Sequence, residues 1–514
     1  MRLIDYFQHG RRLGGGGVAL VDGERRMSWA QLEEAVEKLA SAMAASGLSA
    51  GARVGVYSPN DASAFCVVLA TLRLGGVWIP VNARGSREAN QRWLELSGCQ
   101  ALFYHSSLED QALDAAGALR GPAVVICLDR AGQGGARSLA AFLARAGRPA
   151  PEPDDAPDSL ATLFPTGGTT GLAKAARWTP RTWEALMGAF WRCMPSVAPP
   201  VHLVAAPMTH AAGVLALCAM AGGGTNVLLS KVSPELILDA IEQHRISHLY
   251  LPPTLVYALL DHPGVRARDF SSLRYLLIAA SPIAPARLRE AMDVFGPAVC
   301  QCYGQAEAPM FLTFLSSRDL REGPQGRWAS CGRGALAARV EIMGPDGALL
   351  GAGERGEIVA RGSLVIAGYH DNPEADSAAL TDGWRRTGDI GYRDDEGFVY
   401  IVDRAKDMIV SGGFNVFSAE VEQVILEHPA VLNCAVIGVP DPKWGEAVKA
   451  VVELKEGASL DPAELTALVR ARLDAVHAPK SVEIWDALPR SPAGKVMKAE
   501  IRERFWRDHD RRVG

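Results

Sequence analysis

The sequence predicts an α/β protein with a large N-terminal domain and a smaller α+β C-terminal domain. Its 514 residues correspond to about three folding units, at roughly 150 residues per domain. Strand and helix patterns alternate near the N-terminus and again over 201–300, which indicates two α/β subdomains with parallel sheets. Short strands with intervening turns follow over about 332–400 and indicate a small β-rich subdomain.

The first subdomain can be followed element by element. A strand over 18–21 precedes Ser28, which forms a capping box with Gln31 at the start of a helix that runs to about residue 47. A βαβ unit follows, with its strand, helix and strand at 53–57, 62–74 and 77–81. The longest uncharged stretch, 211–230, is interrupted by three glycines, so we interpret it as a buried helix, a turn and a strand and not as a membrane span.

One main boundary is predicted along the chain. The stretch 133–158 is rich in Gly, Ala, Pro and acidic residues, which predicts a linker that contains loops. A charged segment after Asp403 separates the last part of the chain, about 110 residues with an α+β pattern. We therefore assign 1–403 to the N-terminal domain and 404–514 to the C-terminal domain.

Composition excludes several classes of function. Hydrophobic residues make up 48% and charged residues 22%, as in soluble globular proteins, and a net charge of −5 provides no basic surface for nucleic acid. The N-terminus lacks the apolar core of a signal peptide, so we expect a cytoplasmic protein. Nine scattered cysteines without a CxxC pattern predict reduced thiols. His244 and His248 could share a helical face, but with no third ligand nearby we expect an ordinary histidine pair and not a zinc site.

A glycine- and threonine-rich segment carries the first chemical signal. Residues 166–174 read Thr-Gly-Gly-Thr-Thr-Gly-Leu-Ala-Lys and follow an apolar run. Glycines allow a close approach of the backbone, free N–H groups form an anion nest, and the lysine adds positive charge, so the pattern favours phosphate binding. It is not a Walker A loop, because no Gly-Lys-Ser/Thr ends it. The alternative interpretation is a surface glycine turn.

This segment resembles the phosphate-binding signature of the adenylate-forming superfamily, which includes acyl- and aryl-CoA ligases, luciferases and peptide-synthetase adenylation domains. The family pattern is Thr-Ser-Gly-Thr-Thr-Gly-x-Pro-Lys-Gly, from which this chain departs at Gly167, Ala173 and Ala175. Five further segments resemble family motifs in the family's order: Pro207-Met208-Thr209-His210, Tyr303-Gly304-Gln305-Ala306-Glu307, Trp384-Arg385-Arg386-Thr387-Gly388-Asp389, Asp403-Arg404-Ala405-Lys406-Asp407 and Pro489-Arg490-Ser491-Pro492-Ala493-Gly494-Lys495.

The resemblance implies a two-domain fold with a mobile C-terminal domain, a hinge at Lys406, and a role for each motif. Glu307 and Thr166 would hold Mg²⁺, and Lys495, Glu307 and Lys174 would be catalytic. Asp389 would bind the ribose, Arg404 the ribose or phosphate, and Tyr303 the adenine. The implied ATP-binding residues are Thr166, Gly167, Gly168, Thr169, Thr170, Gly171, Lys174, Ala280, Ser281, Tyr303, Gly304, Gln305, Asp389, Arg404 and Lys495. Taken singly, Asp389, Arg404 and Lys495 would more often be turn or surface residues, and it is the joint order of the motifs that favours the functional roles.

Two departures weaken the expected phosphate and metal contacts. Gly167 removes one hydroxyl from the loop, and Ala306 stands where the family usually has a threonine before the glutamate. A water could replace the contact of that missing hydroxyl. Trp444 is expected to be structural and not catalytic.

Coenzyme A is the implied second substrate, with ATP and Mg²⁺ serving the first step. The substrate-side motif around Met208 and His210 lacks the aspartate that peptide synthetases use for an amino group, and no carrier segment follows Lys495. Gly412 and Gly413 resemble the segment that borders the pantetheine tunnel in the ligases, although a tight turn between two strands would also need glycines.

The acid is expected to be a hydrophobic fatty or aryl monocarboxylate. Alignment with the motifs gives an apolar pocket without fixed charge: Trp183, Met208, His210, Pro253, Ala279, Cys302, Gly304 and Met310. His210 either gates the pocket, faces the carboxylate or simply packs. Gly304 has no side chain where acetate-using relatives carry a tryptophan, which predicts room for acids longer than propionate. A non-catalytic nucleotide- or CoA-binding protein and a luciferase-like oxygenase remain as alternatives, and a homodimer is one open choice for the assembly.

Overall fold

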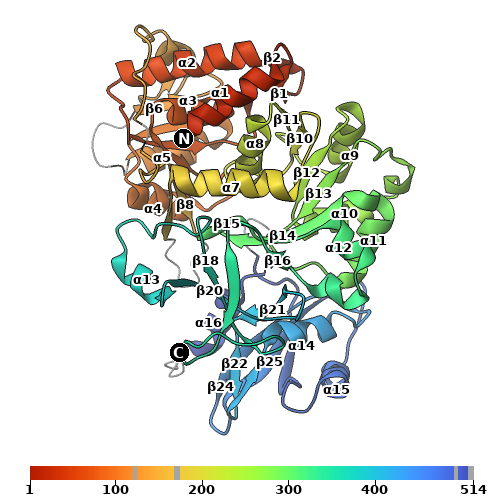
Figure 1. The fold of residues 1–514 in the computed structure, drawn as a ribbon. Coiled ribbons are helices and arrows are strands. Elements are labelled where there is room, and N and C mark those ends of the chain that lie inside the picture. Colours follow the sequence, from red (N-terminus) through yellow and green to blue (C-terminus); the bar gives the residue numbers. More distant parts are fainter. Residues whose placement is uncertain (118, 120–123, 155, 167–173, 491–495, 508–514) are drawn as a thin grey trace. The chain divides into compact units, whose positions relative to one another are not determined.

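In a computed structural model of the protein, the described residues are 1–117, 119, 124–154, 156–166, 174–490 and 496–507 (Figure 1). The architecture is α/β, as predicted. The chain divides into a large unit, Met1–Val340 with Ala360–Arg385, and a small unit, Glu341–Val359 with Arg386–Gly514. This division rests on compactness and does not test the hinge expected at Lys406, which stays a prediction.

A seven-stranded sheet forms the first half of the large unit. Its strand order is β7-β6-β5-β3-β4-β8-β9, and neighbouring strands are parallel except β9, which runs antiparallel to β8. The strands are β3 (Arg53–Tyr57), β4 (Val77–Pro80), β5 (Ala101–Tyr104), β6 (Val124–Cys127), β7 (Arg137–Ser138), β8 (Thr162–Pro165) and β9 (Ala175–Trp178). The helices of this half are α2 (Trp29–Ala45), α3 (Ala62–Arg73), α4 (Arg87–Ser97), α5 (Glu109–Gly117) and α6 (Leu139–Leu143).

A second sheet completes the large unit. Its strand order is β16-β15-β14-β13-β12-β10-β11-β1-β2, with a parallel centre from β14 to β1 and antiparallel ends. The strands are β1 (Val18–Asp22), β2 (Arg25–Ser28), β10 (Val201–Val204), β11 (Thr225–Leu228), β12 (His248–Leu251), β13 (Tyr275–Ile278), β14 (Val299–Gln305), β15 (Ala308–Leu315) and β16 (Gly332–Gly334). The helices are α1 (Leu3–Gly14), α7 (Pro180–Cys193), α8 (Ala211–Ala221), α9 (Pro234–Gln243), α10 (Pro253–Leu260), α11 (Pro285–Phe295), α12 (Ser317–Glu322) and α13 (Pro373–Ala378), the last followed by the short strand β19 (Leu380–Thr381).

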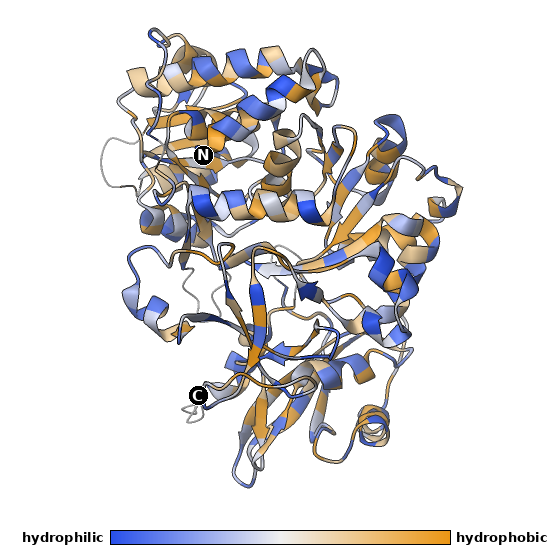
Figure 2. Cartoon of the chain, in the orientation of Figure 1, coloured by the Kyte–Doolittle hydropathy of each residue, from blue (hydrophilic) through white to orange (hydrophobic). Residues whose placement is uncertain are grey.

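Local signals in the sequence set these elements as predicted. Ser28 accepts the backbone N–H of Gln31, and the Gln31 side chain accepts that of Ser28, which completes the capping box of α2. The apolar stretch 211–230 forms the buried helix α8, a glycine turn and β11 (Figure 2). His244 ends α9 while His248 lies in β12, so the shared helical face considered for them is wrong. None of the described helices is long and apolar enough to cross a membrane.

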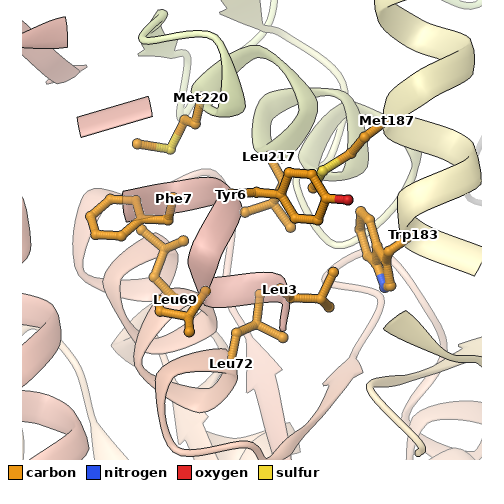
Figure 3. Close-up of a pocket in the computed structure, with 10 residues that line it drawn as sticks. Leu3, Tyr6, Phe7, Leu69, Leu72, Trp183, Met187, Leu217 and Met220 are labelled. Atoms are coloured by element: carbon orange, nitrogen blue, oxygen red, sulfur yellow. The ribbon is translucent and has the colours of Figure 1, made fainter. Parts of the chain in front are cut away.

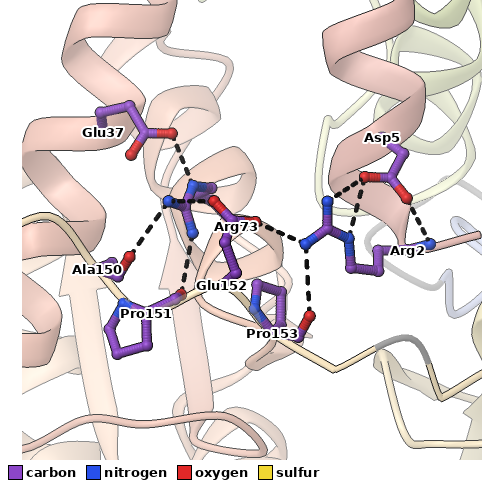
Figure 4. Close-up of polar contacts among 8 residues, drawn as sticks. All are labelled: Arg2, Asp5, Glu37, Arg73, Ala150, Pro151, Glu152 and Pro153. Carbon is purple, nitrogen blue, oxygen red and sulfur yellow. Dashed lines mark hydrogen bonds and ion pairs between the residues drawn. The ribbon is translucent and has the colours of Figure 1, made fainter.

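The N-terminal helix α1 is held by packing and by charge. Its apolar side meets α3, α7 and α8 around a cavity of about 10 Å³, with Trp183 forming one wall (Figure 3). The Arg2 guanidinium bonds to Asp5 and to Glu152, and Glu152 also pairs with the buried Arg73 of α3 (Figure 4). Arg73 therefore connects the N-terminus to the linker that precedes β8.

The small unit contains two groups of strands. The first has the order β17-β18-β20-β21, with β17 (Arg339–Met343), β18 (Gly356–Arg361), β20 (Trp384–Arg393) and β21 (Phe398–Arg404). The division assigns the residues up to Val340 in β17, from Ala360 in β18 and up to Arg385 in β20 to the large unit. The second is a five-stranded sheet of β22 (Ile409–Ser411), β23 (Phe414–Val416), β24 (Val431–Asp441), β25 (Gly445–Leu454) and β26 (Ser481–Ile484). Its helices are α14 (Ser418–Ile425), α15 (Pro462–Arg472) and α16 (Lys498–Trp506). Apolar residues of α14 and α15 form a core with those of β24 and β25.

Candidate functional site

The β8–β9 hairpin brings together the two ends of the predicted phosphate loop. Pro165 pairs with Ala175 in the antiparallel ladder, and just beyond it the Thr166 backbone N–H donates to the Lys174 carbonyl over 2.9 Å. The Lys174 N–H lies 3.4 Å from Thr166 Oγ1. The loop residues between them lie outside the described residues, including the predicted contacts Gly167, Gly168, Thr169, Thr170 and Gly171.

Glu307 and Lys174 are joined through a tyrosine that the sequence analysis missed. The Tyr369 hydroxyl donates to Glu307 Oε1 over 2.7 Å, and Lys174 Nζ lies 5.0 Å from the centre of the Tyr369 ring. Burial, followed by the charge of Glu307, raises the pKa of Tyr369, so its hydroxyl stays protonated and keeps donating at neutral pH. An antiparallel bridge between Ala176 and Tyr369 fixes this arrangement, because it places Tyr369 beside the strand that follows Lys174.

The surroundings of Glu307 fit a magnesium ion that would be bound by this carboxylate together with the phosphates of a nucleotide. Tyr369 occupies one carboxylate oxygen of Glu307 and so orients the side chain. Among the described residues, no three His, Cys, Asp or Glu side chains gather into a metal-binding group. Mg²⁺ is commonly bound by one or two protein carboxylates plus substrate phosphates, so a single glutamate suits such a site.

Residues predicted for the nucleotide and for the acid lie at the ends of two adjacent parallel strands. Ile278 of β13 pairs with Gln301 of β14, so the predicted acid residues Ala279 and Cys302 follow side by side, and the predicted nucleotide residues Ala280 and Tyr303 come next in the chain. Ala280 has φ = +80°, a conformation that non-glycine residues rarely adopt. Ligands of α/β sheets bind at the carboxyl ends of the strands, and strained residues cluster at such sites.

His210, a residue predicted to contact the acid, lies at one end of a chain of aromatic rings. Phe164 stacks on Trp178 with ring centres 4.7 Å apart and meets His210 edge-on at 6.3 Å. Burial, helped by the charge of Arg84, lowers the pKa of His210 to about 4, so the imidazole is neutral at physiological pH. The ring of Trp183 lies 5.3 Å from that of Trp178.

Trp183 is a buried residue of α7. It has no exposed surface, it borders the small cavity beside α1, and its indole Nε1 donates to Thr162 Oγ1 over 3.1 Å. Its predicted contact with the acid stays a prediction. Trp178 belongs to the same aromatic group and donates to the Ala306 carbonyl over 2.8 Å, although the motifs did not single it out.

Asn60 positions the segment that carries His210. Its Oδ1 accepts the Met208 backbone N–H over 2.7 Å. Its Nδ2 donates to the carbonyls of Val204, Ala206 and Leu229, at 2.9 to 3.1 Å. Asn60 follows β3, at the carboxyl edge of the first sheet, and this position was the sequence signal that could have revealed it.

The expectation of open space at Gly304 is wrong. A Cβ atom at Gly304 would lie 2.5 Å from the Met310 backbone nitrogen and 2.8 Å from the Ala308 carbonyl oxygen. The backbone of β15, which pairs with β14, closes this position, so glycine is required for strand packing here. Met310 itself has φ = +57° and turns the chain at the same place.

In the small unit, two predicted nucleotide residues are neighbours. Asp389 of β20 pairs with Arg404 of β21, and Arg404 Nε lies 3.6 Å from Asp389 Oδ1. Glu357 supports this hairpin by accepting the Gly388 backbone N–H over 2.9 Å and the Arg386 guanidinium over 2.7 Å. The turn that includes Lys406 follows directly, and Lys495 lies outside the described residues.

Buried charges surround the predicted hinge. Asp403 Oδ2 accepts the Ser418 hydroxyl over 2.8 Å, and Ser418 also accepts Lys498 Nζ over 2.8 Å. Asp407 pairs with Arg502 over 2.8 Å. The residues on both sides of Lys406 are thus bonded to helices α14 and α16.

Gly412 and Gly413 form a two-residue turn between β22 and β23, as the structural alternative predicted. Both have positive φ, +59° and +83°, which favours glycine. A Cβ at Gly412 would lie 2.6 Å from the Trp444 ring, whereas a Cβ at Gly413 would meet nothing within 4 Å. The turn therefore leaves an open approach on the side of Gly413.

Known proteins match this chain over nearly its whole length. The family model for AMP-binding enzymes matches residues 7–370, and that for the AMP-binding enzyme C-terminal domain matches residues 420–495. A medium/long-chain-fatty-acid–CoA ligase of Mycobacterium tuberculosis is 37% identical, covering 96% of this chain and 88% of its own. A feruloyl-CoA synthase of Amycolatopsis sp is 36% identical, covering 96% of this chain and 97% of its own.

A solved structure agrees in fold. The amide bond synthetase of Marinactinospora thermotolerans superposes with a TM-score of 0.88 at 31% identity, covering 98% of this chain and 100% of its own. The ordered motifs, the Glu307 and Lys174 cluster, and these full-length similarities agree, and the chain belongs to the AMP-binding enzyme family, within the adenylate-forming superfamily.

Proposed function

We propose that this protein is an AMP-forming carboxylate–CoA ligase. In the first step a carboxylate oxygen attacks the α-phosphorus of ATP, and the bond to pyrophosphate breaks. In the second step the thiol of coenzyme A attacks the acyl carbonyl, and AMP leaves. The observation that supports this proposal is the cluster of Lys174, Tyr369 and Glu307, which places a cation and a carboxylate, the predicted magnesium ligand, beside the predicted phosphate loop.

The chain's own residues supply positioning and charge in the first step. Lys174 neutralises the leaving phosphates, and Asp389 with Arg404 binds the ribose side of the nucleotide. Glu307 is the residue that would hold Mg²⁺, which when bound neutralises phosphate charge. Lys495 is proposed to stabilise the charge where the carboxylate meets the α-phosphate. Gly412 and Gly413 are proposed to border the path of coenzyme A after movement about Lys406.

The acid is proposed to be a hydrophobic fatty or aryl monocarboxylate. The rings of Phe164, Trp178 and His210 provide aromatic walls, and His210 is neutral because its pKa is about 4. Relatives that act on fatty acids and on a feruloyl group fall within this class of acid. A cytoplasmic location and a homodimer remain predictions.

The choice of acceptor is the part most in need of a test, because a structural relative is an amide bond synthetase. ATP–pyrophosphate exchange is measured with a series of acids, and the adenylate is then offered coenzyme A or a primary amine. Acid-dependent exchange followed by thioester formation supports the ligase. Exchange followed by amide but no thioester would assign the chain to amide synthesis, and binding of ATP without exchange would favour a non-catalytic protein.

A further inference from the structure

Arg385 is a buried cation whose donors are largely unused. Its side chain is 3% exposed, and Nη2 donates to Asp376 Oδ1 over 3.2 Å. Nε and Nη1 have no hydrogen-bond partner among the described residues. Since Nε carries one N–H and Nη1 two, three of the five guanidinium donors are unsatisfied. Buried polar groups are normally paired, so these donors call for an acceptor that the protein itself does not supply.

The position of Arg385 indicates what that acceptor is. The guanidinium carbon lies 5.2 Å from the centre of the Tyr369 ring, the same ring that Lys174 contacts and whose hydroxyl binds Glu307. Asp376 connects Arg385 with Tyr369, because its carboxylate accepts the Tyr369 backbone N–H as well as the Arg385 guanidinium. Arg385 and Lys174 thus both lie close to the ring of Tyr369, whose hydroxyl bonds to the predicted magnesium ligand Glu307. Two cations and a magnesium ligand in one place suit a polyphosphate.

The chain lacks a donor at this place that its family usually has. Ala306 stands next to Glu307 where the family pattern has a threonine hydroxyl, and Trp178 holds the Ala306 carbonyl. The guanidinium is a stronger donor toward phosphate than a hydroxyl, because its hydrogen bonds to phosphate are charge-assisted.

We propose that Arg385 binds the phosphate chain of the nucleotide and compensates for the hydroxyl that Ala306 lacks. This inference rests on the proposed adenylating function, since it names a further residue of the same site. It assigns to Arg385 a contact with the β- and γ-phosphates, the part of ATP that leaves as pyrophosphate.

Loss of the Arg385 guanidinium should affect nucleotide affinity and thermal stability differently. Arg385→Met should weaken the binding of ATP and of pyrophosphate by roughly 10- to 100-fold, the loss expected for charge-assisted hydrogen bonds. AMP, which lacks these phosphates, should bind as before. The thermal midpoint of the ligand-free variant should change little, because the substitution removes three unsatisfied buried donors, while Asp376 loses an ion pair but is 26% exposed and keeps the Tyr369 backbone N–H. A purely structural arginine would instead lower the midpoint and leave the three affinities in their original ratio.

Three further variants sharpen the test. Arg385→Lys should keep part of the pyrophosphate affinity, and adding Ala306→Thr to Arg385→Met should restore part of it. Arg287→Met is the matched control, because Arg287 lies 5.1 Å from the Tyr257 ring and pairs with Asp261 over 2.6 Å. It should change the midpoint without changing nucleotide affinity.

The affinities are measured by titration calorimetry on the full-length protein, with wild-type ATP–pyrophosphate exchange run in parallel. Unchanged pyrophosphate affinity in Arg385→Met, or an equal loss of AMP and ATP affinity, would overturn the role of Arg385. If Arg385→Met does not fold, the Arg385→Lys affinities decide in the same way. Absence of exchange in a wild-type protein that binds ATP would overturn the proposed function alone.

Discussion

Replacing Tyr369 by phenylalanine removes the hydroxyl that holds Glu307 and keeps the ring that contacts Lys174 and Arg385. The lost hydrogen bond joins a buried hydroxyl to a carboxylate over 2.7 Å, and such bonds contribute about 1.5–3 kcal/mol. Loss of an outer partner of a metal ligand typically weakens metal binding by roughly 10- to 100-fold, in agreement with that range. We therefore expect Tyr369→Phe to raise the Mg²⁺ concentration needed for tight ATP binding by this factor.

The assay is calorimetric ATP binding at increasing Mg²⁺, without acid, so that it does not depend on turnover. Tyr104→Phe is the matched control, because the Tyr104 hydroxyl also donates to a glutamate, Glu109, over 2.9 Å in a buried position. Both variants should lose stability, but Tyr104→Phe should keep the wild-type Mg²⁺ dependence. An unchanged Mg²⁺ dependence in Tyr369→Phe would refute the view that this hydroxyl orients the metal ligand.

Four further outcomes are expected. Lys495→Ala should slow adenylation by roughly 10²–10³ and spare thioester formation from preformed adenylate, and equal damage to both half-reactions would contradict this. Gly413→Leu should spare pyrophosphate exchange and slow the CoA step. Gly457→Leu controls for backbone strain, because Gly457 has a comparable φ of +73° and open space around its Cβ position. The wild-type kcat/KM should rise from acetate to decanoate, since each buried CH₂ contributes about 0.8 kcal/mol, and a preference for acetate would exclude the hydrophobic pocket. Burial lowers the pKa of His248 to about 3 from its ordinary 6.5. Between about pH 3 and 6.5 the unfolded state therefore binds more protons than the folded state, and the stability of the protein should fall as the pH falls through this range. His248→Phe should flatten the pH dependence of the urea midpoint.

The elements with strong local signals could be predicted from the sequence, and their bounds agree closely with the structure. The strand at 53–57 is β3, and the capping box at Ser28 starts α2. These predictions succeed because the alternation of apolar residues and the chemistry of a helix cap depend on residues only a few positions apart. The motifs assigned Asp389 and Arg404 to the nucleotide by resemblance, but their pairing across β20 and β21 became visible only in the structure.

The remainder depends on contacts between distant segments. Tyr369 meets Glu307 across 62 residues of sequence, and no local pattern marks it as a partner. The space beside Gly304 was misjudged for a related reason: a missing side chain looks like an opening in a sequence, but here the backbone of β15 fills it. Arg385 was read as part of a ribose motif, and only its burial and unsatisfied donors distinguish it from Arg386, which Glu357 neutralises.

The four hydrogen bonds of Asn60 have a consequence for recombining this enzyme with its relatives. One amide from the edge of the first sheet holds Val204, Ala206 and Leu229 in the second, and it fixes the backbone at Met208. A chimera that takes the first sheet from one parent and the second from another would take Asn60 from one parent and its hydrogen-bond partners from the other. If the donor parent carried a different residue at position 60, the segment bearing His210 would shift, and specificity would change without any substitution near the acid. Crossover points that keep Asn60 and residues 204–229 from the same parent should therefore give chimeras that retain the acid preference of that parent.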